Sequence, residues 1–391
     1  MRLGLTAFGG PVAHLGYFRR EFVERAGWLD DATFSEIVAV CSALPGPTSS
    51  QVGMSLGALR AGPLGALTAW LAFTTPSALL LGLFGFALRA GASSGFAASP
   101  AWRGAEAALL GAAGAVVVLA VYVLSKSLAR TTAARAIALG ALALALVVNR
   151  EAPQLQWLPL LFGALAGLFA LRNAPPTSAH SLLPRAGTRS VILAFALFLA
   201  LAVALPALAA KGSYLALFSQ FFRAGSLVFG GGHVVLPLIR AFAGPDVISN
   251  ANFFAGYAAA QTVPGPLFTF ASFVGAANSS PASGALGALV ATLGIFAPSF
   301  LLLALAFPLW NALRVLPRAA AALAGVNASV VGLLAAVAID PIGLNLILSP
   351  ISLASALGAF GALFVLELPS WAVVVAAALL GAVAAAFGVP R

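Results

Sequence analysis

Long apolar segments follow one another along the whole chain, separated by short polar stretches. Thirteen of them lie near 3–18, 33–60, 63–88, 103–124, 133–149, 156–171, 190–208, 213–239, 252–277, 283–310, 319–339, 342–366 and 370–389. A helix of about 17 to 25 residues crosses the hydrocarbon core of a bilayer, and most of these segments reach that length. The sequence therefore predicts an all-α, polytopic membrane protein with about 12–13 hydrophobic segments.

The composition excludes several other classes of protein. Of 391 residues, 61% are hydrophobic and 8% are charged, which leaves too few polar side chains to cover a soluble multidomain enzyme. The single Cys41 excludes an internal disulfide, and His14, His180 and His233 are too scattered to form a zinc site. We therefore expect no cofactor and no metal.

The basic residues indicate how the chain lies in the membrane. The formal net charge is +10, and the arginines gather between the apolar segments. Such basic loops stay in the cytoplasm, beside anionic lipid. Aromatic residues are not interleaved with them, as a nucleic-acid surface would need. We predict a multi-pass protein of the cytoplasmic (inner) membrane that contacts the lipid bilayer and no nucleic acid.

Three motifs occur twice, in the same order, in the two halves of the chain. They are Phe8-Gly9-Gly10 and Phe229-Gly230-Gly231, each six residues after an arginine (Arg2 and Arg223), then Pro45-Gly46-Pro47 and Pro264-Gly265-Pro266, then residues 65–81 and 287–303. In the last pair, ten of the seventeen aligned residues are identical. Because chance does not produce three collinear matches, we expect a first repeat at 1–171, a polar connector with a linking span at 172–212, and a second repeat at 213–391.

The number of crossings between the copies decides their relative orientation. If each half has six spanning segments and 190–208 is an extra linking span, seven crossings separate the two Phe-Gly-Gly motifs. An odd number places the halves in opposite orientations, and such inverted repeats are a transporter architecture. If 33–60 and 252–277 re-enter the membrane instead of crossing it, this count changes.

Each Pro-Gly-Pro motif lies inside an apolar segment and breaks its helix. At membrane depth, broken backbone is tolerated only where it lines a cavity or is covered by protein. A new helix beginning at the second proline favours an anion, because its first amides are free and its dipole is positive there. The amides expected to be free belong to Gly46, Thr48, Ser49, Gly265, Leu267 and Phe268. The substrate-binding residues predicted here are Pro45, Gly46, Pro47, Thr48, Ser49, Gln51, Gln261, Pro264, Gly265, Pro266 and Thr269, to which Ser50 adds a hydroxyl.

The glycine motifs have two interpretations: they either pack helices closely or bring backbone amides up to a ligand. Arg223 favours the second, because a guanidinium inside an apolar segment marks a functional position. Arg2 lies at the terminus and could instead extend to the interface. His233 could donate to an anion, titrate near neutrality, or pack as a satisfied histidine. The candidates from these motifs are Arg2, Gly9, Gly10, Arg223, Gly230, Gly231, Gly232 and His233.

Few other polar residues lie inside apolar segments. Glu36 and Glu106 could carry a coupling proton, or could pair with an arginine such as Arg103. His14 has no counterpart at the matching position of the second half, so we assign it no role.

At these motifs the sequence resembles the chromate ion transporter family in its long, two-domain form, over almost the whole chain. The resemblance is carried by FGGP at 8–11, LPGPT at 44–48 with Gln51, GSLVFGGGHVVLP at 225–237 and QTVPGPLF at 261–268. It implies an inner-membrane efflux protein for chromate that also recognises sulfate as a tetrahedral dianion of similar size. It also implies two homologous domains in opposite orientation.

These observations favour a secondary active exporter that holds an oxyanion between the two repeats. The chain has no Gly-x-x-x-x-Gly-Lys-Ser/Thr loop, so ATP hydrolysis by this polypeptide is excluded as the motor. An anion channel or a carrier of sulfate or another dianion is the alternative. A lipid-phosphate enzyme would need a general base and an acidic metal cluster, and neither is visible. We predict no enzyme activity, with chromate or a sulfate-like dianion as partner and a homodimer left open.

Overall fold

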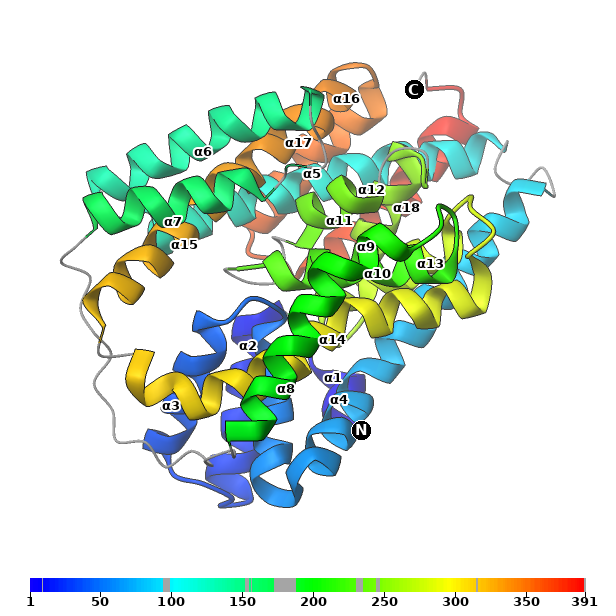
Figure 1. Cartoon of the computed structure of the whole chain (residues 1–391). Helices are drawn as coiled ribbons and strands as arrows, with labels where there is room; N and C mark the ends of the chain where they lie inside the picture. Colours follow the sequence, from blue (N-terminus) through cyan, green and yellow to red (C-terminus); the bar gives the residue numbers. More distant parts are fainter. Residues whose placement is uncertain are drawn as a thin grey trace.

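The structure is a computed structural model that describes residues 1–8, 10–93, 99–151, 155, 157–171, 188–229, 235–243, 247–313 and 316–389. Within these ranges every regular element is helical, as the sequence predicts (Figure 1). The first half contains α1 (Arg2–Thr6), α2 (Gly10–Phe18), η1 (Arg19–Arg25), α3 (Asp31–Ala43), α4 (Thr48–Ser93), α5 (Pro100–Leu128), α6 (Thr132–Glu151) and α7 (Leu158–Ala170). A linking stretch of α8 (Thr188–Leu199), η4 (Ala200–Ala204) and α9 (Leu205–Leu208) follows.

The second half is likewise helical in its described residues. It contains α10 (Tyr214–Leu227), α11 (Val235–Ala243), α12 (Asn250–Ala260), η6 (Leu267–Thr269), α13 (Phe270–Ala277), α14 (Gly284–Leu313), α15 (Pro317–Val337), η7 (Ala338–Gly343), α16 (Leu344–Ile347), α17 (Pro350–Phe364) and α18 (Ser370–Ala386). Each of the thirteen apolar segments overlaps at least one of these helices, and α4 runs through two of the segments.

Polar side chains set several helix starts. The Oδ1 of Asp30 accepts the Thr33 amide at 2.8 Å, which also lowers the pKa of Asp30, because the bond favours the charged carboxylate. Ser99, Ser213 and Ser249 cap α5, α10 and α12 in the same way. These caps satisfy amides that have no partner inside the helix, and so fix where each helix begins.

Within the described ranges, five helices are long and apolar enough to cross a membrane. They lie at Thr48–Gly91, Pro100–Leu128, Arg189–Leu208, Gly284–Pro308 and Pro317–Ile347. The expected thirteen segments are therefore not thirteen continuous helices, because glycine and proline divide several of them. Within α4 itself, Ala61 and Gly62 are not helical, and Gly62 has a φ of +61°. The 13 residues of α3 extend for about 20 Å, so this helix alone cannot cross a core of about 30 Å.

One long helix of each half, α5 or α15, packs against the last two helices of the other half. α5 lies along α17 and α18, while α15 lies along α6 and α7 (Figure 1). Glycines permit close contact at both places: a Cβ added to Gly104 would lie 2.2 Å from the Gly381 carbonyl oxygen, and one added to Gly325 would lie 2.0 Å from that of Gly163. Such small residues let membrane helices approach closely, so the two halves form one interlocked body.

The centre of the molecule is built from α4, α13 and α14. α1 packs on α4, and α10 packs on α14. The two contacts correspond closely: Gly4 lies against the Ala72 carbonyl, and Gly225, its counterpart two residues after the arginine, lies against the Ile295 carbonyl, one position beyond the residue aligned with Ala72. α13 in turn packs against both α4 and α14. Elements of the two halves therefore meet where the helix breaks are found.

Candidate functional site

The helices are interrupted at both Pro-Gly-Pro motifs and just before both Phe-Gly-Gly motifs. Pro45–Pro47 separates α3 from α4, and Pro264–Pro266 separates α12 from η6. α1 ends at Thr6 before the first Phe-Gly-Gly, and α10 ends at Leu227 before the second. Each half therefore contributes two breaks: the one at Pro-Gly-Pro is predicted from the sequence, and the one beside Phe-Gly-Gly is not.

Each Pro-Gly-Pro break is hydrogen-bonded to the Phe-Gly-Gly break of the other half. The Gly46 amide donates to the Val228 carbonyl at 2.7 Å, and the Gly265 amide donates to the Ala7 carbonyl at 2.9 Å. Val228 and Ala7 are equivalent residues, since each directly precedes the phenylalanine of its motif. The four breaks thus form two matching pairs that join the halves.

Both central glycines are required by the backbone and by the space around them. Gly46 has a φ of +123° and Gly265 a φ of +105°, which L side chains rarely adopt. A Cβ on Gly46 would lie 2.8 Å from Ser299 Oγ, and one on Gly265 would lie 2.7 Å from Ser77 Oγ. Ser77 and Ser299 occupy equivalent positions in the aligned stretches 65–81 and 287–303. Each break therefore rests on a serine of the other half.

The expectation of free amides is wrong at Gly46 and Gly265, because carbonyls of the opposite half already accept their hydrogens. The amides of the following turn remain at a helix start. The first intrahelical bond of α4 runs from the Gln51 amide to the Pro47 carbonyl at 2.9 Å, so Thr48 and Ser49 precede it. Their amides carry the positive end of the α4 dipole.

Gln51 connects the first break to the second half. Its Nε2 donates to the Pro45 carbonyl at 2.7 Å and to Ser299 Oγ at 3.4 Å. On α14, Phe296 and Phe300 share a face with Ser299, and both rings contact the Trp70 indole, with centroids 5.6 and 5.7 Å away. Gln51 and Trp70, both from α4, therefore contact the same face of α14.

Several buried polar atoms around the breaks have no protein partner in the described part of the chain. Four belong to donor groups: Ser50 Oγ, Trp70 Nε1, Thr74 Oγ1 and Gln261 Nε2. Gln51 Oε1, an acceptor, is a fifth. An unmade bond costs a buried polar group about 1–3 kcal/mol, so a cluster of unpaired donors needs an explanation. Trp70, Thr74 and Ser77 lie one turn apart on α4, which extends this polar strip toward the second break.

His14, to which the sequence analysis assigned no role, lies beside the Pro45–Pro47 break. Its ring is 1% exposed, with Nδ1 3.2 Å from Ser49 Oγ and Nε2 3.1 Å from the Ala7 carbonyl oxygen. The repeat comparison passed over it because it has no counterpart in the second half. Trp70 and Thr74 were missed for the same reason, whereas Ser77 and Ser299 stand in an identical Pro-Ser pair that could have been found.

The two arginines that the repeat makes equivalent have different surroundings. Arg2 forms an ion pair with Glu21 at 2.7 Å and is largely exposed, beside a small pocket of about 210 Å³. Arg223 is half-buried and lies over the Phe242 ring, 4.6 Å from its centroid. Among the described residues it forms no ion pair with a carboxylate. Of the two, only Arg223 keeps a guanidinium without an acidic partner.

The remaining candidates are distributed as follows. Thr269 is buried, and its hydroxyl donates to the Pro266 carbonyl at 2.6 Å. Glu36 is buried on α3, and Glu106 is partly buried on α5. Gly10 begins α2 with a φ of +75°. Gly9, Gly230, Gly231, Gly232 and His233 lie outside the described residues.

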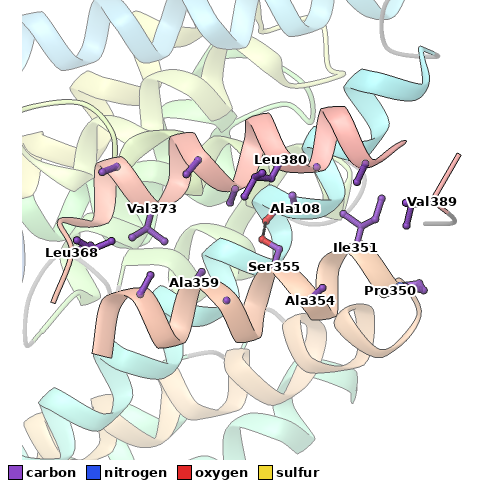
Figure 2. A pocket seen from close by; sticks show the side chains of 17 residues that line it. Ala108, Pro350, Ile351, Ala354, Ser355, Ala359, Leu368, Val373, Leu380 and Val389 are labelled. Atoms are coloured by element: carbon purple, nitrogen blue, oxygen red, sulfur yellow. Dashed lines mark hydrogen bonds between the residues drawn. The ribbon is translucent and has the colours of Figure 1, made fainter. Parts of the chain in front are cut away.

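A larger cavity of about 710 Å³ lies between α17 and α18, beside α5 (Figure 2). Its lining is made of alanine, leucine, valine and other apolar residues, and its Ser355 hydroxyl is already donated to the Ala108 carbonyl at 2.7 Å. An anion entering it would lose its hydration without gaining donors. We therefore do not expect an anion site in this cavity.

The arrangement at the breaks suits non-covalent binding of an anion. Unpaired donors of several kinds belong to the elements that form the breaks: helix-start amides, the hydroxyls of Ser50 and Thr74, the Trp70 indole and the Gln261 amide. No group of three or more His, Cys, Asp or Glu side chains that could hold a metal occurs among the residues described. Backbone amides and hydroxyls recognise charge and shape, so they do not distinguish one tetrahedral dianion from another.

Comparison with known proteins gives a consistent result over both halves. A family model described as "Chromate transporter" matches residues 1–168 and again residues 215–382. The "Chromate transport protein" of Pseudomonas aeruginosa is 31% identical over 343 residues, which cover 87% of this chain and 79% of that protein. The protein of the same name from Cupriavidus metallidurans is 30% identical over 342 residues, covering 85% and 78%. The "Probable chromate transport protein" of Synechococcus elongatus is 27% identical over 338 residues, covering 86% and 81%. No solved structure matches the chain.

Proposed function

Because the chain belongs to the chromate transporter family, and is thus a membrane transporter and not an enzyme, we propose that it exports chromate across the cytoplasmic membrane as a secondary transporter. Sulfate, a tetrahedral dianion of similar size, is proposed as a second ligand. The observation that carries the proposal is that elements joined at the cross-bonded helix breaks hold several buried donors without a partner in the described part of the chain.

In the proposed site, the oxyanion binds at the start of α4. Thr48 and Ser49 offer amides at the positive helix end, and Ser50 and Thr74 offer hydroxyls. Trp70 contributes its indole N–H from the same face as Thr74. Arg223 supplies positive charge from the second half. A doubly charged ligand would satisfy several donors at once, which accounts for why the fold leaves them unpaired.

We propose that the two halves, 1–171 and 213–391, are homologous repeats of opposite orientation, with 172–212 as connector and linking span. The double match of the family model supports the repeat. The reciprocal bonds of Gly46 and Gly265 support a two-fold relation between the halves. The linking helix at Arg189–Leu208 is long enough to cross and has none of its most apolar stretch buried, which suits contact with lipid.

Export of a dianion needs little additional energy. Moving one charge through 100 mV is worth about 2.3 kcal/mol, so a dianion leaving a cell that is negative inside gains about 4.6 kcal/mol. Glu36 and Glu106 stay predictions as coupling carboxylates.

The test is uptake of labelled chromate into inverted vesicles, with sulfate as competitor. Thr74→Val and Trp70→Phe each remove one donor, and each should raise KM about tenfold or more, because a hydrogen bond to a charged ligand is worth about 1.5–3 kcal/mol. Arg223→Ala should lower transport further. Thr68→Val is the matched control, since Thr68 lies exposed on the same helix and its hydroxyl donates to the Gly65 carbonyl.

The outcomes separate the alternatives. Vesicles holding the wild type that take up no chromate would remove the proposed function. Unchanged KM in Thr74→Val, Trp70→Phe and Arg223→Ala would remove the proposed site while keeping the function. Uptake without stoichiometric movement of either a counter-anion or a proton would favour an oxyanion channel.

A further inference from the structure

The hydrogen bonds of His14 fix which ring nitrogen carries the proton in the neutral side chain. The Ala7 carbonyl can only accept, so Nε2, 3.1 Å away, must donate to it. In a neutral imidazole, Nδ1 is then an acceptor. At 3.2 Å, Nδ1 therefore accepts the hydroxyl hydrogen of Ser49. The Ser49 oxygen consequently presents lone pairs, and not a hydrogen, to anything else that approaches it.

This orientation of the Ser49 hydroxyl is the wrong one for an anion. Ser49 belongs to the first turn of α4, where the amides and the helix dipole favour negative charge. While His14 is neutral, the Ser49 hydroxyl therefore cannot donate a hydrogen bond to an anion at this helix start. A proton on Nδ1 reverses this, because Nδ1–H then donates to Ser49 Oγ and frees the hydroxyl hydrogen to point at the anion.

His14 also touches the bond that joins the two halves. The Ala7 carbonyl that accepts from His14 is the same one that accepts from the Gly265 amide at 2.9 Å. The path from Ser49 through His14 and Ala7 to Gly265 therefore connects the first Pro-Gly-Pro break with the second. The edge of the imidazole meets the Phe73 ring, with centroids 5.2 Å apart, and both His14 and Ser49 are buried.

The carboxylates of η1 are engaged elsewhere, α4 has none, and the other charged side chains of these two elements are arginines, Arg20 and Arg89 among them. On η1, Arg19 pairs with Asp31 and Glu24, and Glu21 pairs with Arg2 and Arg25. On α4, Arg60 lies over the Trp28 ring, 5.7 Å from its centroid. In the described part of the chain His14 forms no ion pair, so the charge that would stabilise its protonated form has to come from the ligand.

We propose that His14 is the proton site of transport: it binds one proton at Nδ1 when the oxyanion binds at the start of α4, and so turns the Ser49 hydroxyl toward the anion. The proton comes from water on the side from which the anion enters, the Ser49 hydrogen stays on Ser49, and the proton leaves with the anion. His14 acts through Ser49 as a positioning residue. This inference rests on the proposed function, since it needs an oxyanion at that helix start.

Linkage makes the inference measurable. If one proton binds with each anion, the two must raise each other's affinity by the same factor. The KM for the dianion should then rise up to tenfold per pH unit wherever His14 is neutral in the free protein. Sulfate is a suitable second probe, because it takes up no proton itself near neutral pH.

The experiment uses the full chain in proteoliposomes, with KM for chromate and for sulfate measured from about pH 5.5 to about pH 8.5. Chromate KM is expressed per concentration of dianion. In parallel, a pH-sensitive dye reports proton uptake when sulfate or chromate is added to the detergent-purified protein. We expect a rising KM with pH and uptake of one proton per anion in the wild type.

Variants assign the proton to His14. His14→Gln keeps a donor for Ala7 and an acceptor for Ser49 but cannot titrate, so we expect a flat KM and no proton uptake. His14→Asn is the second variant should Gln not fold. Ser49→Ala should weaken binding at low pH and reduce the slope, whereas Ser50→Ala should weaken binding with the wild-type slope. A wild-type slope in a folded His14 variant, or no proton uptake by an anion-binding wild type, would overturn the inference. Absence of any anion transport by the wild type would instead sink the proposed function.

Discussion

Replacing Gly265 with alanine tests whether the cross-half bonds hold the centre together. Gly265 has a φ of +105°, and the added Cβ would lie 2.7 Å from Ser77 Oγ, where ordinary contact begins at 3.4 Å. Ser77 cannot easily yield, because its hydroxyl is bonded to the Thr74 carbonyl at 3.2 Å and the residue is buried within α4. The break itself must therefore move, by about 0.7 Å.

The size of the effect follows from two costs. A non-glycine residue in such a conformation is strained by about 1–3 kcal/mol. Moving the break also stretches the bond from the Gly265 amide to the Ala7 carbonyl, now 2.9 Å, and a buried amide left unpaired costs about 1–3 kcal/mol. We expect Gly265→Ala to destabilise the protein by about 2–6 kcal/mol, a large part of the stability of a typical domain.

The matched control is Gly284→Ala. Gly284 also has a positive φ, +69°, but an added Cβ there would meet nothing within 4 Å, so only backbone strain applies. Thermal unfolding in detergent, followed by the loss of monodisperse protein, compares the two variants. Uptake of chromate into vesicles then shows whether the site has moved. If Gly265→Ala unfolds no earlier than Gly284→Ala and transports with the wild-type KM, the cross-half bond has no structural importance.

Three further predictions concern the helices around the centre. Ser352→Ala removes a buried hydroxyl that donates to the Ala107 carbonyl of the other half at 2.8 Å, and should lower the stability measured by thermal unfolding by about 1 kcal/mol. Ser127→Ala is the control and should cost little, because the exposed Ser127 hydroxyl bonds within its own turn. Ser99→Ala removes the cap of α5 and should also cost about 1 kcal/mol, measured in the same way. Asp30→Asn should lower the stability of the protein above about pH 4, where wild-type Asp30 is ionised. The difference between variant and wild type should vanish as the pH falls through the lowered pKa of Asp30. A difference that persists in acid would show that charge at this cap is irrelevant.

Much of the fold could be predicted from the sequence, because membrane helices leave a local signal. The apolar segments correspond to the observed helices, and Pro45–Pro47 and Pro264–Pro266 do interrupt them. Local chemistry is sufficient for this, since proline and glycine weaken a helix whatever surrounds it. The internal repeat also indicated which positions would be equivalent. What it did not indicate is where each break finds its partner.

The partner of each break depends on contacts between residues more than 180 positions apart, which no local pattern contains. Gly46 bonds to Val228, and Gly265 bonds to Ala7, so the amides that looked free in the sequence are used to join the halves. The same bonds explain why glycine stands there in both copies. A side chain would collide with Ser299 or Ser77, both of which also come from the opposite half.

Comparing the two repeats gave misleading expectations at positions where their residues differ. These positions include residues of the proposed site. The comparison favoured Arg2 as the counterpart of Arg223, yet the two arginines differ. Arg2 is paired with Glu21, whereas Arg223 lies over the Phe242 ring. The comparison discarded His14 because no equivalent exists, yet His14 contacts Ser49 at a helix break. Similar positions in the two halves set the helix breaks. A ligand that enters from one side of the membrane and leaves from the other, however, can make use of different side chains at the two breaks. In the proposed site, the first half would supply a titratable group and hydroxyls and the second a permanent positive charge, so that the two halves contribute different functions.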